Sequence, residues 1–234
     1  MQASGIYFNN PVRFADGVRM QEQLVQARAA DQIPDTVLFL EHRPVVTLGT
    51  RGRTDFLRAS PETLAAKGID FVRASRGGDV TFHGPGQLVV YPILRLGGTE
   101  ADSHGYLNNL EELAIRTAAD FGVRAYRRKG MNGAWTDVGK IAAIGFRLKR
   151  WVTMHGMSFN VDIDLAGFQT IVPCGLEGQP VASLKTILGD RCPALSDVRE
   201  KMRRNFEMVF ARPLRILTAA ASLPDEVERA LRGM

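Results

Sequence analysis

The stretch RGGDVTFHGPGQLVVYP, from Arg76 to Pro92, carries the most informative pattern in this sequence. Its glycines stand at positions 77, 78, 84 and 86, where they permit positive φ angles and a close approach of another molecule to the backbone. Pro85 between two glycines predicts a sharp turn, so we expect Val80–His83 and Gln87–Leu94 to form a hairpin-like pair. His83 would end the first strand beside a pocket. The alternative is a tight hairpin with one surface histidine.

The length and composition indicate an ordinary globular protein. The 234 residues fit one generous domain or one domain with a small appendage, and 45% are apolar against 24% charged. No apolar run approaches the roughly 18–20 residues of a membrane helix. The start, MQASGIYFNN, has the pattern of neither a secretory signal nor a transit peptide. We therefore expect a cytoplasmic protein that does not enter a membrane.

The net charge bears on the possible partners, and the cysteines bear on the possible nucleophiles. The net charge of +5 and the pI of about 9.5 permit an acidic partner, but the basic residues are spread widely and form no nucleic-acid motif. A solvated surface is the simpler interpretation, and attraction of an acidic protein is the functional one. The two cysteines, Cys174 and Cys192, form neither a CxxC motif nor a disulfide framework, so either could be a free nucleophile.

The hydrophobic patterns predict an α+β domain. Helices are expected at Val18–Ala29, Pro61–Lys67, Asp102–Phe121 and Ser196–Phe210, with a terminal helix at Ser222–Leu231. Strands are expected at Thr36–Glu41, Val45–Gly49, Ile69–Ala74, Val123–Arg127, Ala134–Val138, Lys140–Leu148, Trp151–Met154 and Met157–Ile163, besides the two of the opening stretch. Short turns between the later strands favour antiparallel or mixed pairing, so we predict a mixed sheet with packed helices.

Two further segments contain candidate catalytic groups. Lys140 stands just before the small, apolar strand IAAIG, where partial desolvation would favour the neutral amine and let it act as a base. The alternative is a lysine that ends a strand and reaches into water. Cys174 lies between Pro173 and Gly175, which leaves its sulfur unshielded, with backbone amides nearby for an oxyanion. The alternative is a buried, inert cysteine. Cys192 lies in a charged loop and is treated as incidental.

Several motifs together resemble the lipoyl(octanoyl) transferase family. The opening stretch matches its Arg-Gly-Gly, Thr-aromatic-His-Gly-Pro-Gly-Gln and Tyr-Pro signature. The further matches, in the family's order, are EHRPVVTLG (41–49), GKIAAIG (139–145), HGMSFNV (155–161) and PCG (173–175). Ala182 departs from the pattern, because a hydroxyl residue is expected there. The similarity runs from about residue 5 to 216, and it implies the fold of biotin and lipoate ligases.

The resemblance also implies a reaction and a site. It predicts an acyltransferase domain over residues 1–216 and a short tail over 217–234. Cys174 and Lys140 would form a dyad, and Cys174 would carry an acyl thioester. The acyl-binding residues implied are Arg76, Gly77, Gly78, Asp79, Val80, Thr81, Phe82, His83, Ala143, Ile144, Gly145, Gly156, Met157 and Ser158. Of these, His83 is expected to orient the thioester or the dyad.

The partners implied by the resemblance are an octanoyl-acyl carrier protein as donor and lipoyl domains as acceptors. Those domains belong to 2-oxoacid dehydrogenase complexes and the glycine cleavage H protein. The resemblance implies an octanoyl or lipoyl group as cargo, neither cofactor nor metal, no nucleic acid, and a monomer. Because an amide forms from a thioester, the reaction needs no ATP.

Three alternatives remain open at this point. An ATP-dependent lipoate or biotin ligase would share the fold, but it needs a nucleotide loop that the sequence lacks and has no use for Cys174 as a nucleophile. A zinc enzyme would use His83, His155 and Cys174, which form no short metal-binding pair. A non-catalytic module that binds nucleic acid or lipoyl domains would retain its function after Cys174→Ser.

Overall fold

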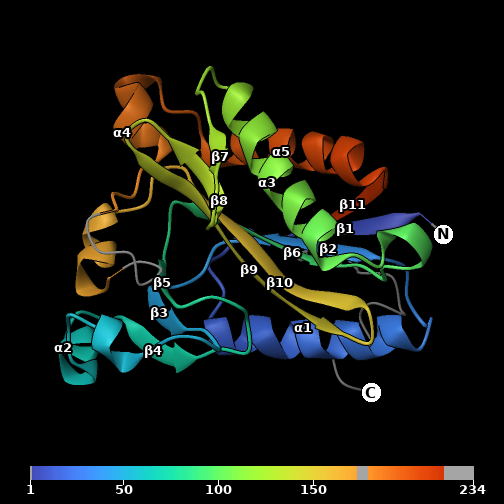
Figure 1. Cartoon of the computed structure of the whole chain (residues 1–234), viewed down its shortest axis with the longest axis horizontal. Coiled ribbons are helices and arrows are strands. Elements are labelled where there is room, and N and C mark those ends of the chain that lie inside the picture. The colour runs from blue at the N-terminus through green and yellow to red at the C-terminus, as the bar shows by residue number, and fades with distance from the viewer. Residues whose placement is uncertain (1, 173–178, 219–234) are drawn as a thin grey trace.

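The computed structural model describes residues 2–172 and 179–218, and within them one large and one small sheet (Figure 1). The large sheet has the spatial order β11 (Leu214–Thr218), β1 (Ala3–Tyr7), β2 (Thr36–Leu40), β6 (Gln87–Ile93), β10 (Val152–Asn160), β9 (Gly139–Lys149), β8 (Met131–Thr136) and β7 (Tyr126–Arg128). The small sheet has the order β4 (Asp70–Arg73), β3 (Val45–Leu48) and β5 (Val80–His83). The predicted α+β class with mixed pairing is confirmed, since β1 pairs with β2 and β11 in parallel while β6 to β10 pair antiparallel.

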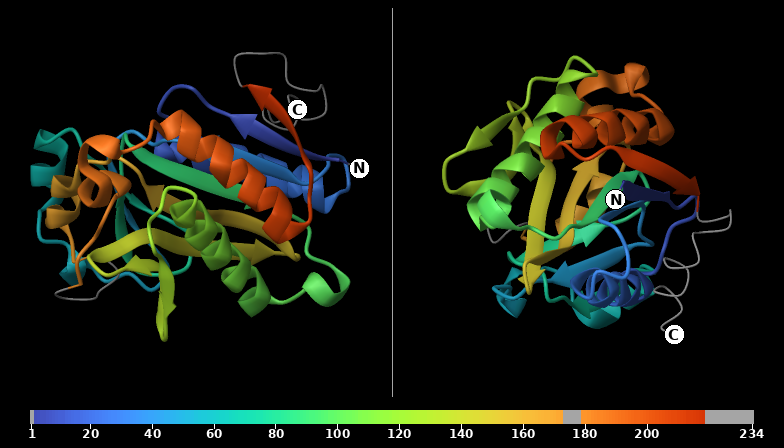
Figure 2. Two further views of the ribbon diagram at one scale, coloured as in Figure 1. Left: turned by 90° about the horizontal axis from the view of Figure 1, so that it is seen from above. Right: turned by 90° about the vertical axis from the view of Figure 1, so that its right-hand side faces the viewer.

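Helices cover both faces of the large sheet. The described helices are α1 (Phe14–Ala29), α2 (Pro61–Ala66), α3 (Ser103–Ala119), α4 (Leu184–Leu188) and α5 (Leu195–Phe210), with 3₁₀ segments at η1 (Thr54–Phe56), η2 (Gly98–Glu100), η3 (Leu165–Thr170) and η5 (Gly189–Arg191). Figure 2 shows α3 and α5 over one face and α1 over the other. No helix in the described ranges has both the length and the apolar character that a membrane crossing requires.

Strands β2 and β6 are largely apolar because both of their faces are buried. In β2, Val37 and Phe39 pack into the core beneath α3 and α5, whereas Leu38 and Leu40 pack into the core against α1. Strand β6 repeats this alternation. Period-two alternation with two covered faces explains why TVLFL contains no polar residue after its threonine.

The helix ends follow the local sequence. Ser60 accepts a hydrogen bond from the Thr63 N–H with Pro61 at the first helical position, which begins α2 as predicted. Asp102 likewise caps α3 through the His104 N–H, and Gly122 follows that helix with a φ of 74°. Helix α1 begins at Phe14, four residues before the predicted start.

The predicted hairpin between Val80–His83 and Gln87–Leu94 is wrong. Strand β5 belongs to the small sheet and β6 to the large one, so the Gly84–Gly86 turn carries the chain from one sheet to the other. The turn's polar groups bind distant segments: the Gly86 N–H donates to the Glu41 carboxylate (2.7 Å), and the Gly86 carbonyl accepts from Val161 and Asp162. These long-range bonds replace the ladder of a hairpin.

Several strands also differ from the sequence-based prediction. Trp151–Met154 and Met157–Ile163 are one strand, β10, which continues through His155 (φ 60°) and Gly156 (φ 150°). Strands β1 and β11 were not predicted. The domain boundary proposed at residue 216 falls inside β11, and the predicted helix at 222–231 lies outside the described residues.

Candidate active site

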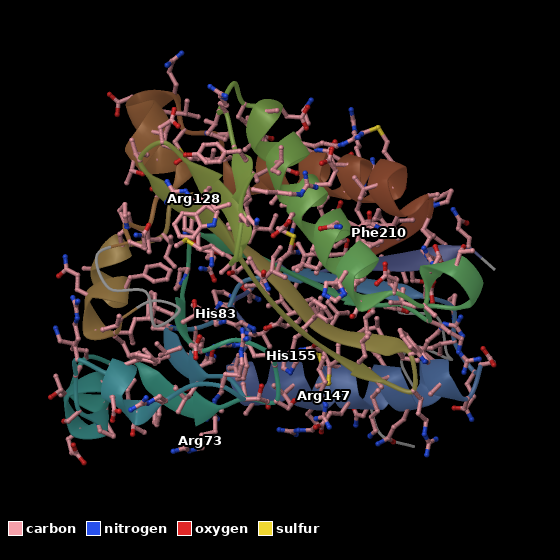
Figure 3. The ribbon with its side chains drawn as sticks, viewed as in Figure 1. Arg73, His83, Arg128, Arg147, His155 and Phe210 are labelled. Atoms are coloured by element: carbon pink, nitrogen blue, oxygen red, sulfur yellow. The ribbon has the colours of Figure 1, made fainter. Side chains whose placement is uncertain are left out.

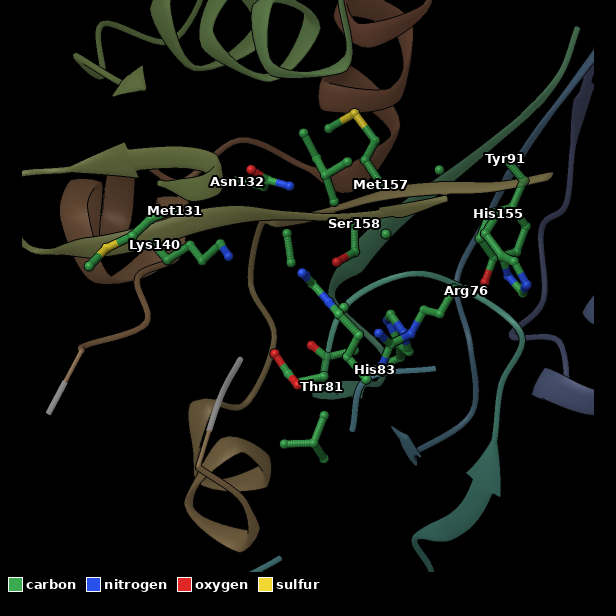
Figure 4. A pocket seen from close by; sticks show the side chains of 18 of the residues that line it. Arg76, Thr81, His83, Tyr91, Met131, Asn132, Lys140, His155, Met157 and Ser158 are labelled. Atoms are coloured by element: carbon green, nitrogen blue, oxygen red, sulfur yellow. The ribbon is translucent and has the colours of Figure 1, made fainter. Parts of the chain in front are cut away.

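A cavity of about 410 Å³ lies where β5 and the 76–79 loop face β8, β9 and β10 (Figure 4). Of the predicted site residues, the following line it: Arg76, Gly78, Asp79, Val80, Thr81, His83, Lys140, Ala143, Ile144, Gly145, Gly156, Met157 and Ser158. The structure thus brings together segments up to 82 positions apart, from Arg76 to Ser158. The volume of the cavity falls within the range of roughly 300–1,000 Å³ that is usual for small-molecule sites.

Two predicted residues do not line the cavity, and one cannot be placed. Phe82 lies in the small core beside the 3-stranded sheet, its ring 5.5 Å from that of Phe168, because it alternates with the cavity-facing Thr81 and His83. Gly77 instead donates its N–H to the Phe146 carbonyl (3.0 Å), which ties the loop to β9. Cys174 lies outside the described residues.

Arg76 is buried and anchors the loop to β3. Its Nη2 donates to the carbonyl (2.7 Å) and the hydroxyl (2.8 Å) of Thr47, and its Nη1 donates to the Gly77 carbonyl. Glycines make this possible: a Cβ on Gly49 would lie 2.8 Å from Nη1, and one on Gly145 would lie 2.7 Å from the Gly77 carbonyl oxygen. The TLG and AAIG elements therefore provide the space that the guanidinium and its loop occupy.

Lys140 enters the cavity from the start of β9. Its main-chain N–H donates to the Pro180 carbonyl (2.9 Å), and its carbonyl accepts from the Ala182 N–H (3.0 Å). Its Nζ lies 5.2 Å from the centre of the Trp135 ring, a cation–π contact. Gly133, with a φ of 119°, leaves the room for this side chain, since a Cβ there would lie 2.7 Å from Lys140 Cε.

His83 is held by a hydrogen bond at one of its two ring nitrogens. Its Nδ1 lies 2.7 Å from Gln87 Oε1, and the His83 side chain lines the cavity. The ring of Phe14, the first residue of α1, stacks over it at 6.1 Å. A neutral imidazole that donates through Nδ1 presents Nε2 as an acceptor.

Two more histidines lie beside His83. His42 Nδ1 donates to the Val12 carbonyl (2.9 Å), so its Nε2 accepts from the Tyr91 hydroxyl (2.7 Å). His155 lines the cavity with Tyr91, and its Nε2 lies 3.2 Å from Ser75 Oγ. Figure 3 places His83 and His155 near the centre of the molecule, with Arg73 and Arg147 nearer its edge.

Burial keeps all three imidazoles neutral. It lowers the pKa of His42 from 6.5 to about 4 and the pKa values of His83 and His155 to about 3. For His83 burial is the largest cause; repulsion from a proton on His42, from the Arg76 guanidinium and from a proton on His155 would lower the pKa further, while the bond to Gln87 opposes this. These imidazoles can accept or donate hydrogen bonds near neutral pH without gaining a charge.

Other cavity residues were not predicted as site residues: Arg51, Tyr91, Gly130, Met131, Asn132 and His155. Tyr91 and His155 lie inside motifs that the sequence does reveal, so proximity to those motifs was the available signal. Gly130, in contrast, lies in the turn before β8, and Met131 and Asn132 begin that strand, so only the pairing of β8 with β9 brings them to Lys140. Phe14 was missed because the predicted helix began after it.

The remaining titratable groups support no metal site. Within residues 2–172 and 179–218, no group of three or more His, Cys, Asp or Glu side chains is placed to hold a metal ion. Cys192 is partly buried, its Sγ is 3.6 Å from the Val161 carbonyl, and burial raises the pKa of its thiol. A thiol with a raised pKa is a poor nucleophile at neutral pH, in agreement with its interpretation as incidental.

Comparison with known proteins gives four informative similarities. The family model of the lipoyl protein ligase A/B catalytic domain matches residues 14–207. An octanoyltransferase of Geobacter metallireducens is 46% identical over 91% of this chain and 96% of its own length. The bi-partite lipoate protein ligase of Thermoplasma acidophilum matches with a TM-score of 0.73 at 16% identity, over 99% of this chain and 91% of that one. A biotin protein ligase of Aquifex aeolicus matches less closely, with a TM-score of 0.50 at 11% identity, over 90% and 69%. The predicted likeness to the fold of biotin and lipoate ligases is thus confirmed.

Proposed function

The chain belongs to the octanoyltransferase family and is an acyltransferase, and we propose that it acts through a thioester on Cys174. In this proposal it takes an octanoyl or lipoyl group from acyl carrier protein. It passes the group to a lysine of lipoyl domains, in 2-oxoacid dehydrogenase complexes and in the glycine cleavage H protein. The observation that carries the proposal is the cavity that brings Lys140 together with the signature residues Arg76 to His83.

The cavity walls suit an acyl chain with a polar head. Met131, Ile144 and Met157 supply apolar surface, while Arg51 and Asp79 supply polar groups. Ala143, Gly145 and Gly156 line the cavity along β9 and β10 and carry little or no side chain into it. Such a site matches the general pattern of an apolar pocket with a few placed polar groups.

Chain connectivity supports the pairing of Lys140 with Cys174. The segment that contains Cys174 rejoins the described chain at Gln179, and the next residue, Pro180, accepts a hydrogen bond from the Lys140 N–H. Pro180 is six positions after Cys174 in the sequence, a reach of about 20 Å when fully extended. The described chain that follows Cys174 is therefore bound to the main chain of Lys140, which supports the proposed pairing.

The proposed reaction has two balanced steps. In the first, Cys174 sulfur forms a bond to the donor's thioester carbon, its proton passes to the Lys140 amine, and the pantetheine thiolate leaves and takes that proton. In the second, the amine of a lipoyl-domain lysine bonds to the same carbon and loses a proton through Lys140, and the Cys174 thiolate leaves. Lys140 as a cation would also favour the thiolate of Cys174 before attack.

The test is the intact mass of the protein after mixing with octanoyl-acyl carrier protein in the absence of ATP. Wild type and Cys192→Ser should each gain one octanoyl group that hydroxylamine removes, whereas Cys174→Ser should gain none. Cys192→Ser is the matched control, because it removes the only other cysteine of the sequence. If acylation of a lipoyl domain instead required ATP and no acyl-enzyme formed, the ligase alternative would replace this mechanism.

A further inference from the structure

A continuous line of buried amide hydrogen bonds begins at His83 and ends at the main chain beside Lys140. His83 Nδ1 lies 2.7 Å from Gln87 Oε1, Gln87 Nε2 lies 2.9 Å from Asn160 Oδ1, and Asn160 Nδ2 lies 2.9 Å from the Ala182 carbonyl. The side chains come from the end of β5, the start of β6 and the end of β10. All three residues are buried, with at most 6% of their surface exposed.

The direction of every bond in this line follows from its last member. The Ala182 carbonyl can only accept, so Asn160 Nδ2 donates to it and Asn160 Oδ1 is left to accept. Gln87 must then donate through Nε2 to Asn160, which leaves Oε1 to accept from the imidazole. The proton of His83 is therefore on Nδ1, and its Nε2 carries a lone pair.

The far end of the line is joined to the strand of the catalytic lysine. The Ala182 N–H donates to the Lys140 carbonyl (3.0 Å), so the two peptide groups of Ala182 connect Asn160 with β9. Both connections use main-chain atoms of residue 182. This explains why an alanine serves at the position where the resemblance predicted a hydroxyl residue.

We propose that Gln87 and Asn160 are positioning residues that hold His83 with its proton on Nδ1, so that Nε2 accepts a hydrogen bond from an N–H of the reactants. The inference rests on the proposed function, because the N–H belongs either to the pantetheine arm of the acyl donor or to the lysine amine of the acceptor. The same line sets the position of His83 relative to the strand that carries Lys140.

The environment of His83 fits a hydrogen-bond acceptor better than a carrier of protons. The groups that face it are the imidazoles of His42 and His155, the guanidinium of Arg76 and the ring of Phe14. Burial is the largest cause of its low pKa of about 3, and the charged Arg76 guanidinium acts in the same direction. A neutral imidazole with a fixed tautomer gives the cavity one acceptor at a defined place.

The first test measures the tautomer by ¹⁵N NMR of the histidine side chains in the substrate-free protein. Wild-type His83 should carry its proton on Nδ1. Gln87→Leu removes the acceptor and should abolish that preference, whereas Gln87→Glu keeps an acceptor for Nδ1–H and should retain it. A wild-type His83 protonated on Nε2, or an unchanged tautomer in Gln87→Leu, would overturn the proposal.

The second test compares two substitutions of buried asparagines. Asn160→Leu breaks the line, while Asn205→Leu breaks comparable bonds to Thr117 and Asp120 from α5, far along the chain from the site. Both should lower the stability to urea. Only Asn160→Leu should lower kcat/KM for octanoyl transfer, by about tenfold for the loss of one positioning hydrogen bond. Equal kcat/KM values for the two variants would contradict the proposal.

The two tests separate this inference from the proposed function. The tautomer is measured without substrate, so it supports or overturns the line of hydrogen bonds even if wild type forms no acyl-enzyme. An absent acyl-enzyme together with a fixed tautomer would refute the Cys174 mechanism alone. If the acyl-enzyme formed normally but His83 had no preferred tautomer, only the positioning role of Gln87 and Asn160 would be refuted.

Discussion

The two ends of the cavity both present nitrogen bases, yet they differ in how those bases are surrounded. At the histidine end, His83 and His155 line the cavity and His42 lies buried behind them. His42 packs against His83, all three imidazoles contact the ring of Phe14, and His42 and His155 also contact that of Tyr91. At the lysine end, formed by Lys140, Met131 and Asn132, the amine lies over the Trp135 ring and near the turn into β8 (Figure 4). Burial at the histidine end keeps the imidazoles uncharged, whereas the Trp135 ring at the lysine end offers a π face to the ammonium of Lys140. The difference indicates that hydrogen-bond placement belongs to the histidine end and proton transfer to the lysine end.

Replacing Lys140 with methionine should have the largest effect on activity. Methionine keeps much of the length and the apolar contact but has no proton to give or accept. Octanoyl transfer should therefore slow by about 100- to 10,000-fold, the usual contribution of a general acid–base. The measurement is the single-turnover rate of octanoyl transfer to a lipoyl domain.

Lys149→Met is the matched control, because Lys149 lies at the exposed other end of the same strand. It should retain the wild-type rate. Equal transfer rates in Lys140→Met and Lys149→Met would show that Lys140 does not transfer the proton. The proposed division of roles between the two ends of the cavity would then be wrong.

The histidine end should make the folded protein less stable as the pH falls. In the unfolded chain an imidazole takes up a proton below about pH 6.5, whereas the folded His42, His83 and His155 remain neutral down to about pH 4 or 3. The unfolded state thus binds more protons in this window, so stability is lost as the pH falls from 6.5. Between pH 6.5 and 5 the loss is up to about 2 kcal/mol for each histidine.

Urea unfolding at pH 7 and pH 5 measures this difference. The fourth histidine, His104, has a side chain 90% exposed, so His104→Ala should show the same pH dependence as wild type. An unfolding free energy that is equal at the two pH values, or a cavity histidine that titrates near pH 6.5 by NMR, would show that the imidazoles are not held neutral.

The motifs that contribute residues to both ends of the cavity could be predicted from the sequence, but the long-range contacts that position them could not. The motifs around Thr47, His83, Lys140 and His155 were recognisable because short, Gly-rich patterns are local. The role of the Gly84–Gly86 turn was mistaken because a hairpin and a crossing between sheets begin with the same residues. What distinguishes them is the bond from Gly86 to the Glu41 carboxylate, 45 positions away. Phe14 among the imidazoles is equally non-local, since only the packing of α1 brings it there.

The smallest effect should come from weakening the cation–π contact at the lysine end. Trp135→Phe keeps an aromatic ring in a fully buried site but offers a weaker π face to Lys140, and it removes the indole N–H bond to the Met131 carbonyl (3.0 Å). A contact of about 0.5–1 kcal/mol corresponds to a two- to fivefold loss of transfer rate. Trp151→Phe, at a site with 47% exposure, is the control and should keep the wild-type rate. A Trp135→Phe rate equal to that control would mean that the ring packs beside the lysine without influencing it. A loss as large as that of Lys140→Met would instead show that Trp135 holds the amine in its reactive position, and that the lysine end is as tightly organised as the histidine end.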